Sequence, residues 1–160
     1  MNEVAEQFRR AAESYCALIE ETSADGRDVY DAILERLASL YLAGQRLPQI
    51  EPATEEGLPD RPTMAAMSSV TQRLSPSFEP RDFYWSVDPY DRKPQKNTPG
   101  STISGDLAEI WRDVKQGLLA LEAGSPEDDV VWDWWFGFDS HWGRHAVDAL
   151  AALHKLRSDW

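Results

Sequence analysis

Two stretches near the start of the chain carry apolar residues at every third or fourth position, which is the spacing of one helix face. The first runs from Val4 to Thr22 and stops at Asp25-Gly26, and the second runs from Tyr30 to Tyr41 and stops at Gly44. This spacing predicts two amphipathic helices. Because few residues separate them, we expect them to pack as an antiparallel hairpin.

A third, shorter helix is predicted from Met64 to Leu74. It follows the segment from Gly44 to Pro62, where prolines and acidic residues predict an extended surface connection. Beyond the helix, Phe83, Tyr84 and Trp85 are adjacent in sequence, so they cannot all face one side of a helix or strand. We expect an aromatic plug across one end of the bundle, or alternatively a contact outside the main apolar stripe.

The second half of the chain is predicted to begin with a long loop from Asp88 to Gly105, which is rich in proline and glycine. A strong apolar stripe then predicts a helix from Asp106 to Leu121, closed by the segment from Ala123 to Pro126. Three acidic residues follow Pro126, and such residues are favoured in the first turn of a helix by its dipole. We therefore expect a last helix to start there.

The segment from Val130 to Phe138 fits two patterns, because its aromatic residues alternate as in a strand and also keep a helical period. We predict helix, since no second alternating run is present for a strand to pair with. The chain is therefore expected to be a single all-α domain over residues 1–160, a bundle of five or six helices with two long proline-rich loops. The residues expected to pack the last helix are Trp135, Trp142, Ala146, Ala149 and Leu153.

Histidines form the first candidate site. On a helix, His141, His145 and Asp148 lie one turn apart in succession, beside the apolar stripe that contains Trp142. Imidazoles at the margin of a core commonly bond a carboxylate and hold two helices in register. Two histidines four residues apart can also supply two metal ligands, although the His-Glu-x-x-His motif is absent.

Carboxylates form the second candidate site, because Asp106, Glu109 and Asp113 share one face of the predicted helix from 106 to 121. Three like charges on one face need positive charge nearby. We expect at least one of His141 and His145 to contact these acids, with Arg144 close by and with Gly117 permitting close approach. The cluster is then either an interhelical polar network or a divalent metal site, and we favour the network.

Two blocks of sequence resemble a known family. Residues 106–118 read DLAEIWRDVKQGL and residues 138–150 read FDSHWGRHAVDAL, and both resemble the signature segments of the DUF5063 family, bacterial proteins of unknown function. The resemblance implies that pairing an acidic helix with a His-Trp-Gly-Arg-His helix is a recurring design. It implies no activity, cofactor or catalytic residue.

Composition narrows the range of partners. The chain has 160 residues, enough for one domain, and a formal net charge of −12, which repels nucleic acid and anionic membrane surfaces. No apolar run approaches the roughly 20 residues that span a bilayer, and the N-terminus lacks a secretory signal, so we expect a cytoplasmic protein. The single cysteine, Cys16, is expected at the edge of the core.

These observations leave two functional hypotheses. The favoured one is a non-catalytic, cofactor-free, acidic protein that binds a basic partner protein. Its role would then resemble that of a small acidic antitoxin or immunity protein. The alternative is a metal-dependent hydrolase with ligands or a general base among Asp106, Glu109, Asp113, His141 and His145, and with Arg144 placed for an anionic substrate group. The complete set of candidate site residues is Asp106, Glu109, Asp113, His141, Trp142, Arg144, His145 and Asp148.

Overall fold

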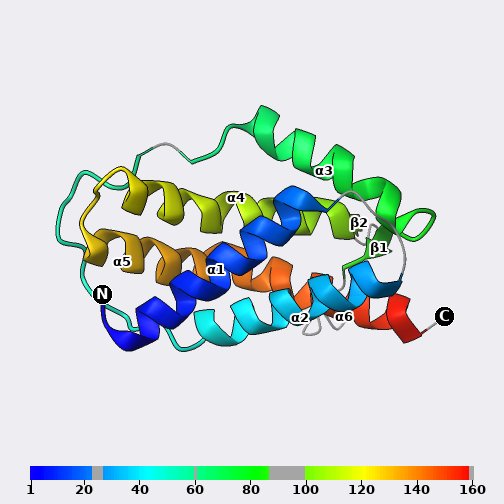
Figure 1. The fold of residues 1–160 in the computed structure, drawn as a ribbon, viewed down its shortest axis with the longest axis horizontal. Helices are drawn as coiled ribbons and strands as arrows, with labels where there is room; N and C mark the ends of the chain where they lie inside the picture. The colour runs from blue at the N-terminus through cyan, green and yellow to red at the C-terminus, as the bar shows by residue number, and fades with distance from the viewer. Residues whose placement is uncertain (23–26, 60, 87–99, 159–160) are drawn as a thin grey trace, which may run out of the picture.

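The two N-terminal apolar stripes form the buried faces of two neighbouring helices. A computed structural model describes residues 1–22, 27–59, 61–86 and 100–158. In it α1 (Glu3–Glu21) starts after Asn2, whose side-chain oxygen accepts a hydrogen bond from the Ala5 N–H at 2.9 Å. α2 (Arg27–Gly44) runs back along α1, which confirms the predicted hairpin (Figure 1). The predicted stop at Asp25-Gly26 lies outside the described residues.

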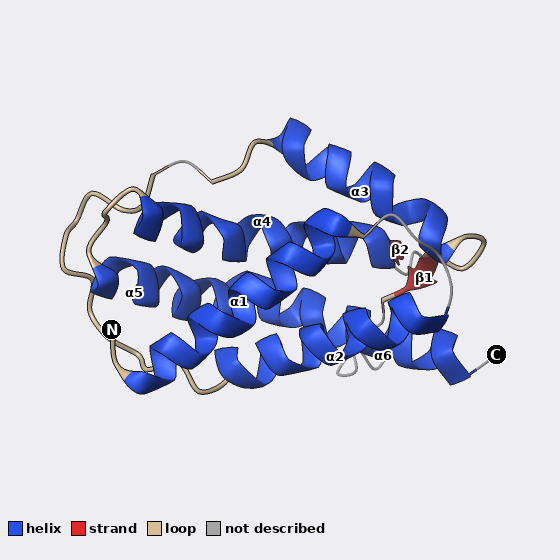
Figure 2. Cartoon of the chain, in the orientation of Figure 1, coloured by secondary structure: helices blue, strands red, loops and turns tan. Residues whose placement is uncertain are grey.

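Helices make up most of the rest of the described chain, so the all-α, single-domain prediction is confirmed (Figure 2). The remaining elements are α3 (Met64–Phe78), β1 (Phe83–Trp85), β2 (Gly100–Thr102), α4 (Ile103–Glu122), α5 (Glu127–Gly137), a π-helical turn (Phe138–Trp142) and α6 (Gly143–Ser158). Within the described ranges, every helix is too short or too polar to cross a bilayer.

α4 is the central helix, packed against α1, α3, α5 and α6. It starts at Ile103, three residues earlier than predicted, because the Thr102 side chain accepts a hydrogen bond from the Gly105 N–H at 3.0 Å and caps the helix. The predicted loop from Asp88 to Gly105 is therefore wrong at its end, where residues 100–102 form a strand and 103–105 the first helical turn. Residues 88–99 of that prediction lie outside the described residues.

A small antiparallel sheet joins β1 to β2, with Phe83 opposite Thr102. Neither strand is predicted from the sequence, because β2 is too short and too polar to show an alternating pattern. Gly100 matters here, since a Cβ at this position would lie 2.3 Å from the Phe83 ring. Both strands lie beside the start of α4 (Figure 1).

The last predicted helix is interrupted by the π turn between α5 and α6. The Gly143 N–H bonds the Phe138 carbonyl, and a Cβ on Gly143 would lie 2.4 Å from that oxygen, so the turn requires glycine. The helical choice for Val130 to Phe138 is confirmed. Trp142 is buried as expected, whereas Trp135 is only partly buried and Trp134 takes the core position instead.

The long connection between α2 and α3 follows the surface, as predicted, and is tied to α5. The Thr54 N–H and hydroxyl donate to the two Asp129 carboxylate oxygens at 2.9 and 2.8 Å. The interior behind α5 is aromatic, with the Phe8 ring centroid 4.9 Å from that of Trp134 and 6.0 Å from that of Trp142. This packing fixes the face that α5 and the π turn present to α4.

Candidate functional site

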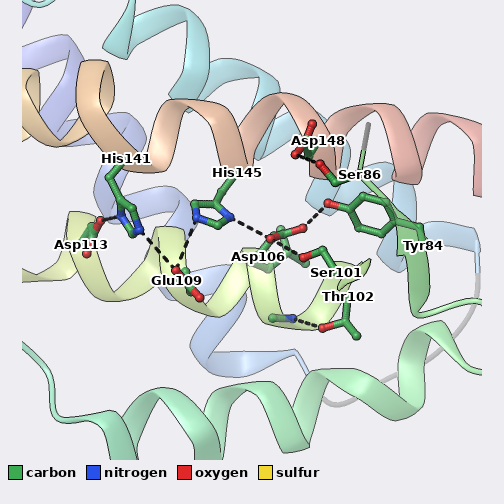
Figure 3. A network of polar contacts seen from close by, with 12 residues as sticks. Tyr84, Ser86, Ser101, Thr102, Asp106, Glu109, Asp113, His141, His145 and Asp148 are labelled. Atoms are coloured by element: carbon green, nitrogen blue, oxygen red, sulfur yellow. Dashed lines mark hydrogen bonds and ion pairs between the residues drawn. The ribbon is translucent and has the colours of Figure 1, made fainter. Parts of the chain in front are cut away.

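The predicted polar cluster forms where α4 faces the π turn and α6. Asp106, Glu109 and Asp113 project from α4, while His141 projects from the π turn and His145 from α6 (Figure 3). The three acids and the two histidines alternate in one continuous row, in the order Asp113, His141, Glu109, His145 and Asp106 (Figure 3). The prediction that at least one histidine contacts these acids is confirmed, because both do.

Each histidine is held at Nδ1 by a different aspartate. The Nδ1 atom of His141 lies 2.5 Å from Asp113 Oδ2, and the Nδ1 atom of His145 lies 2.9 Å from Asp106 Oδ1. An ionised carboxylate can only accept hydrogen bonds, so each Nδ1 carries a proton and donates it. This arrangement fixes the orientation of both rings and leaves both Nε2 atoms for another partner.

Both Nε2 atoms point to the same oxygen of Glu109 (Figure 3). Glu109 Oε2 lies 3.5 Å from the Nε2 atom of His141 and 3.5 Å from that of His145. One ligand atom from each of these three residues lies within 4.8 Å of the other two. A carboxylate and two imidazoles therefore converge on one point between α4 and α6.

Burial changes along the row. Asp106 is 3% exposed and the His145 side chain 18%, whereas the side chains of Glu109 and His141 are 38% and 41% exposed. Water therefore reaches the convergence point from the side of Glu109 and His141. At the buried end, the hydrogen bond that His145 donates to Asp106 raises the pKa of His145, although burial of the ring opposes this effect.

The buried end is anchored by the small sheet, which sequence reasoning missed. The Tyr84 hydroxyl donates to Asp106 Oδ2, and the Ser101 hydroxyl donates to Asp106 Oδ1 at 2.9 Å. Burial and the hydrogen bond to Asp106 raise the pKa of Tyr84. Tyr84 was recognised in the sequence only as one of three adjacent aromatics, and nothing in the pattern distinguished Ser101.

Among the described residues, Arg144, Asp148 and Gly117 make no hydrogen bond or ion pair with the five side chains of the row. Arg144 is exposed, and within the described part of the chain it makes no ion pair with the acids of α4, although it is near enough to His145 for its positive charge to oppose protonation of that ring. Asp148 accepts a hydrogen bond at 2.8 Å from Ser86. Gly117 does permit a close approach, but to the Trp134 indole, whose Nε1–H donates to the Val114 carbonyl at 3.1 Å.

Cys16 is 1% exposed, which makes it a core residue. Burial raises the pKa of its thiol to about 12, so the nucleophilic thiolate is scarce at neutral pH. The cluster of histidine and carboxylate side chains therefore remains the candidate functional site.

A cavity of about 250 Å³ adjoins the cluster, with His141 and Asp113 in its wall. Arg61 also lines it, and its Nη1 atom lies 2.7 Å from Asp113 Oδ1. Asp133 lines it as well, and burial together with the negative charge of Asp113 raises the pKa of Asp133 to about 6. Sequence reasoning missed both residues, although Asp133 is the only charged residue from 130 to 138.

Comparison with known proteins gives the family and the fold. The family model described as "Domain of unknown function (DUF5063)" matches residues 1–159, and the chain therefore belongs to the DUF5063 family, as the two sequence blocks indicated. No curated protein matches the chain.

A crystal structure of protein BF1032 from Bacteroides fragilis is similar in fold, with a TM-score of 0.83. The two sequences are 24% identical, and the similarity covers 97% of this chain and 92% of that one. At this identity the likeness establishes a shared fold and carries no activity from one protein to the other.

Proposed function

We propose that this DUF5063 protein is a metal-dependent hydrolase whose divalent ion is held by Glu109, His141 and His145. The observation that carries the proposal is the convergence of both Nε2 atoms on one Glu109 oxygen, at 3.5 Å each. Both rings reach this point with Nδ1 already bonded to an aspartate. Carboxylate–histidine pairs of this kind orient the ring of a metal-ligating histidine and raise its basicity.

Electrostatics supports a cation at the convergence point. When an imidazole is neutral and its proton is on Nδ1, its Nε2 atom carries a lone pair, so in that state two lone pairs face a carboxylate oxygen. Three electron-rich atoms at this spacing repel one another unless protons or a cation lie between them. A divalent ion satisfies all three atoms at once.

The spacing also suits metal ligation. Two bonds of about 2.1 Å at a tetrahedral angle place their ligand atoms roughly 3.4 Å apart, close to the observed Nε2 to Oε2 distances of 3.5 Å. Two imidazoles and one carboxylate are ligands that suit Zn²⁺, and they also suit non-haem Fe²⁺. Zn²⁺ is the probe of choice because it has no redox chemistry.

The ligand number favours a catalytic site over a structural one. Structural zinc sites have four protein ligands, whereas hydrolytic sites have three and keep a position for water. Glu109 and His141 are both more than a third exposed, so solvent has access. A divalent ion in such a site lowers the pKa of a coordinated water to about 7, which supplies a nucleophile for hydrolysis.

The surrounding residues of the chain support this chemistry. Asp113 and Asp106 hold the two rings, and Tyr84 and Ser101 hold Asp106 in turn. These hydrogen bonds fix the orientation of the ligand atoms relative to the helices and the sheet. The adjoining cavity of about 250 Å³ provides room for a substrate next to His141.

Zinc titration of the chelator-treated protein tests the proposal. We expect one Zn²⁺ per chain by calorimetry, and loss of this binding in Glu109→Gln and in His141→Ala/His145→Ala. Asp139→Asn is the matched control, because it removes a charge from an exposed position of the π turn that holds no ligand. Zinc-dependent hydrolysis of p-nitrophenyl acetate or bis(p-nitrophenyl) phosphate, lost in Glu109→Gln, then tests the catalytic part. Zinc binding that survives all the ligand substitutions contradicts the proposal.

A non-catalytic role in binding a basic protein is the second proposal. Its support is the net charge of −12 together with an exposed aromatic pair, Phe83 and Trp85, whose side chains are 55% and 64% exposed. Their rings form a T-shaped contact with centroids 5.0 Å apart. Exposed aromatic side chains are typical of protein interfaces. Stoichiometric copurification of a basic protein, lost in Phe83→Ser/Trp85→Ser with zinc binding intact, is the result that this proposal expects.

A further inference from the structure

The cavity beside the proposed metal ligands contains a carboxyl group that no described residue hydrogen-bonds or pairs with. Asp133 projects from α5 into the cavity of about 250 Å³ and also lines a second one of about 210 Å³. Within the described part of the chain, no hydrogen bond or ion pair reaches its carboxyl group. A partly buried carboxylate without a partner is unfavourable, because water solvates it poorly there.

The other carboxylate of the cavity has two partners. Asp113 accepts a hydrogen bond from His141 Nδ1 at 2.5 Å and forms an ion pair with the Arg61 guanidinium at 2.7 Å. Arg61 is the cation of the larger cavity, and its Nη1 atom is bonded to Asp113 rather than to Asp133. Two carboxylates and one guanidinium therefore line the cavity, and Asp133 is the carboxylate to which Arg61 is not bonded, although the Arg61 charge acts on it from further away.

Half of the remaining wall residues of the larger cavity are aromatic, namely Trp134, Phe136 and Trp142. Trp134 and Trp142 are almost fully buried, and the Phe136 side chain is 48% exposed at the surface. Phe136 stacks on Trp132, which lines the second cavity, with ring centroids 5.1 Å apart. The faces of aromatic rings attract cations as well as apolar groups.

We infer that this cavity binds an organic ammonium ion with an apolar body, the ammonium group against Asp133 and the apolar part against the aromatic wall. The binding site itself stands on the cavity and its side chains. The idea that this ammonium ion is the substrate class of the metal centre rests on the proposed function. It is based on His141, which belongs both to the cavity wall and to the proposed ligand set. The raised pKa of Asp133 agrees with a carboxylate that is short of positive charge.

Three probes of similar size test the inference: phenethylammonium, 2-phenylethanol and 3-phenylpropionate. They differ in carrying a positive charge, no charge and a negative charge. Each is titrated into metal-free protein in chelator at pH 7.5, and the indole N–H signals of the tryptophans are followed by NMR. We expect saturable shifts with phenethylammonium, and binding about tenfold weaker or more with the other two.

Asp133→Asn keeps the shape of the side chain and removes its charge, so it should weaken phenethylammonium binding about tenfold or more and leave 2-phenylethanol unchanged. Asp128→Asn is the matched control on α5, because Asp128 is exposed and lines neither cavity. Equal phenethylammonium affinity in wild type and Asp133→Asn, or equal affinity for the amine and the alcohol, overturns the inference. The amine titration contains no metal, so the two proposals can fail separately. Amine binding without zinc binding rejects only the metal centre. Zinc binding without amine binding rejects only this inference.

Discussion

The His145 Nδ1 atom lies 2.9 Å from Asp106 Oδ1, and this pair connects the ligand cluster to the two-stranded sheet. Asp106 is 3% exposed and also accepts hydrogen bonds from Tyr84 of β1 and from Ser101 of β2. Three hydrogen bonds stabilise this buried carboxylate and hold it in one orientation. The position of the His145 ring therefore depends on residues more than 40 positions away in sequence.

The first prediction concerns this aspartate. Asp106→Asn should lower zinc affinity by about 10- to 100-fold, because the neutral amide holds the His145 ring less firmly and makes it less basic. Calorimetric zinc titration measures the change. Asp148→Asn is the control, since Asp148 bonds Ser86 and no ligand of the proposed site. An Asp106→Asn protein with wild-type zinc affinity would show that the pair plays no part in ligation.

The second prediction concerns the Tyr84 hydroxyl. Tyr84→Phe should reduce the free energy of unfolding by about 1 to 3 kcal/mol, because it removes a donor from the buried Asp106 carboxylate. Urea denaturation in chelator measures it without a metal contribution. Trp85→Phe is the neighbouring control on an exposed side chain and should stay within about 0.5 kcal/mol of wild type. Equal stability of the two variants would mean that the hydrogen bond contributes nothing.

Periodicity was sufficient to predict the helices and the pairing of the two charged faces. The apolar positions of α4 and α6 specify which sides face the core, and the charged residues beside each stripe must then lie at the same margin. Three acids and two histidines at one margin attract each other, so their contact follows from charge. Arg144 stays exposed beside His145, because a long charged side chain gains more from hydration than from an entry into the cluster.

The π turn explains the errors around the tryptophans. A turn with one extra residue rotates everything before it by about 100° relative to an unbroken helix. Counting back from Trp142, the core position therefore falls on Trp134 instead of Trp135. The sequence contains the glycine that this turn needs, but glycine alone does not distinguish a π turn from a helix end. The strand pairing was missed because three-residue strands have no measurable period.

The third prediction concerns Gly117. Gly117→Ala should reduce the free energy of unfolding by about 1 to 3 kcal/mol, because its Cβ would lie 2.2 Å from the Trp134 Nε1 atom. This cost opposes the gain of up to about 1 kcal/mol that alanine brings to a helix. Chemical denaturation measures the net effect. In a Trp134→Phe background, where the smaller ring vacates space, the same substitution should cost less, and an identical cost in both backgrounds would contradict the contact.

The last prediction concerns pH. Burial and the charge of Asp113 raise the pKa of Asp133 from 3.8 to about 6, so between these values the folded protein binds more protons here than the unfolded chain does. Stability therefore falls as pH rises through this window, and the loss is complete above about pH 6. Asp133→Asn removes the titrating group. It should match wild type near pH 3.5 and exceed it by about 1 to 2 kcal/mol at pH 7.5, a value reduced for partial solvent exposure.

The test is the difference in free energy of unfolding between wild type and Asp133→Asn, measured by urea denaturation from pH 3.5 to 7.5 in chelator. Asp113, Arg61 and His141 also face this cavity, but they are present in both proteins, so the difference isolates Asp133. Asp128→Asn corrects for the loss of one negative charge from an acidic protein. A difference that is constant with pH would mean that the Asp133 carboxyl is as well solvated in the folded state as in the unfolded chain, and it would remove the electrostatic support for a cation at this position.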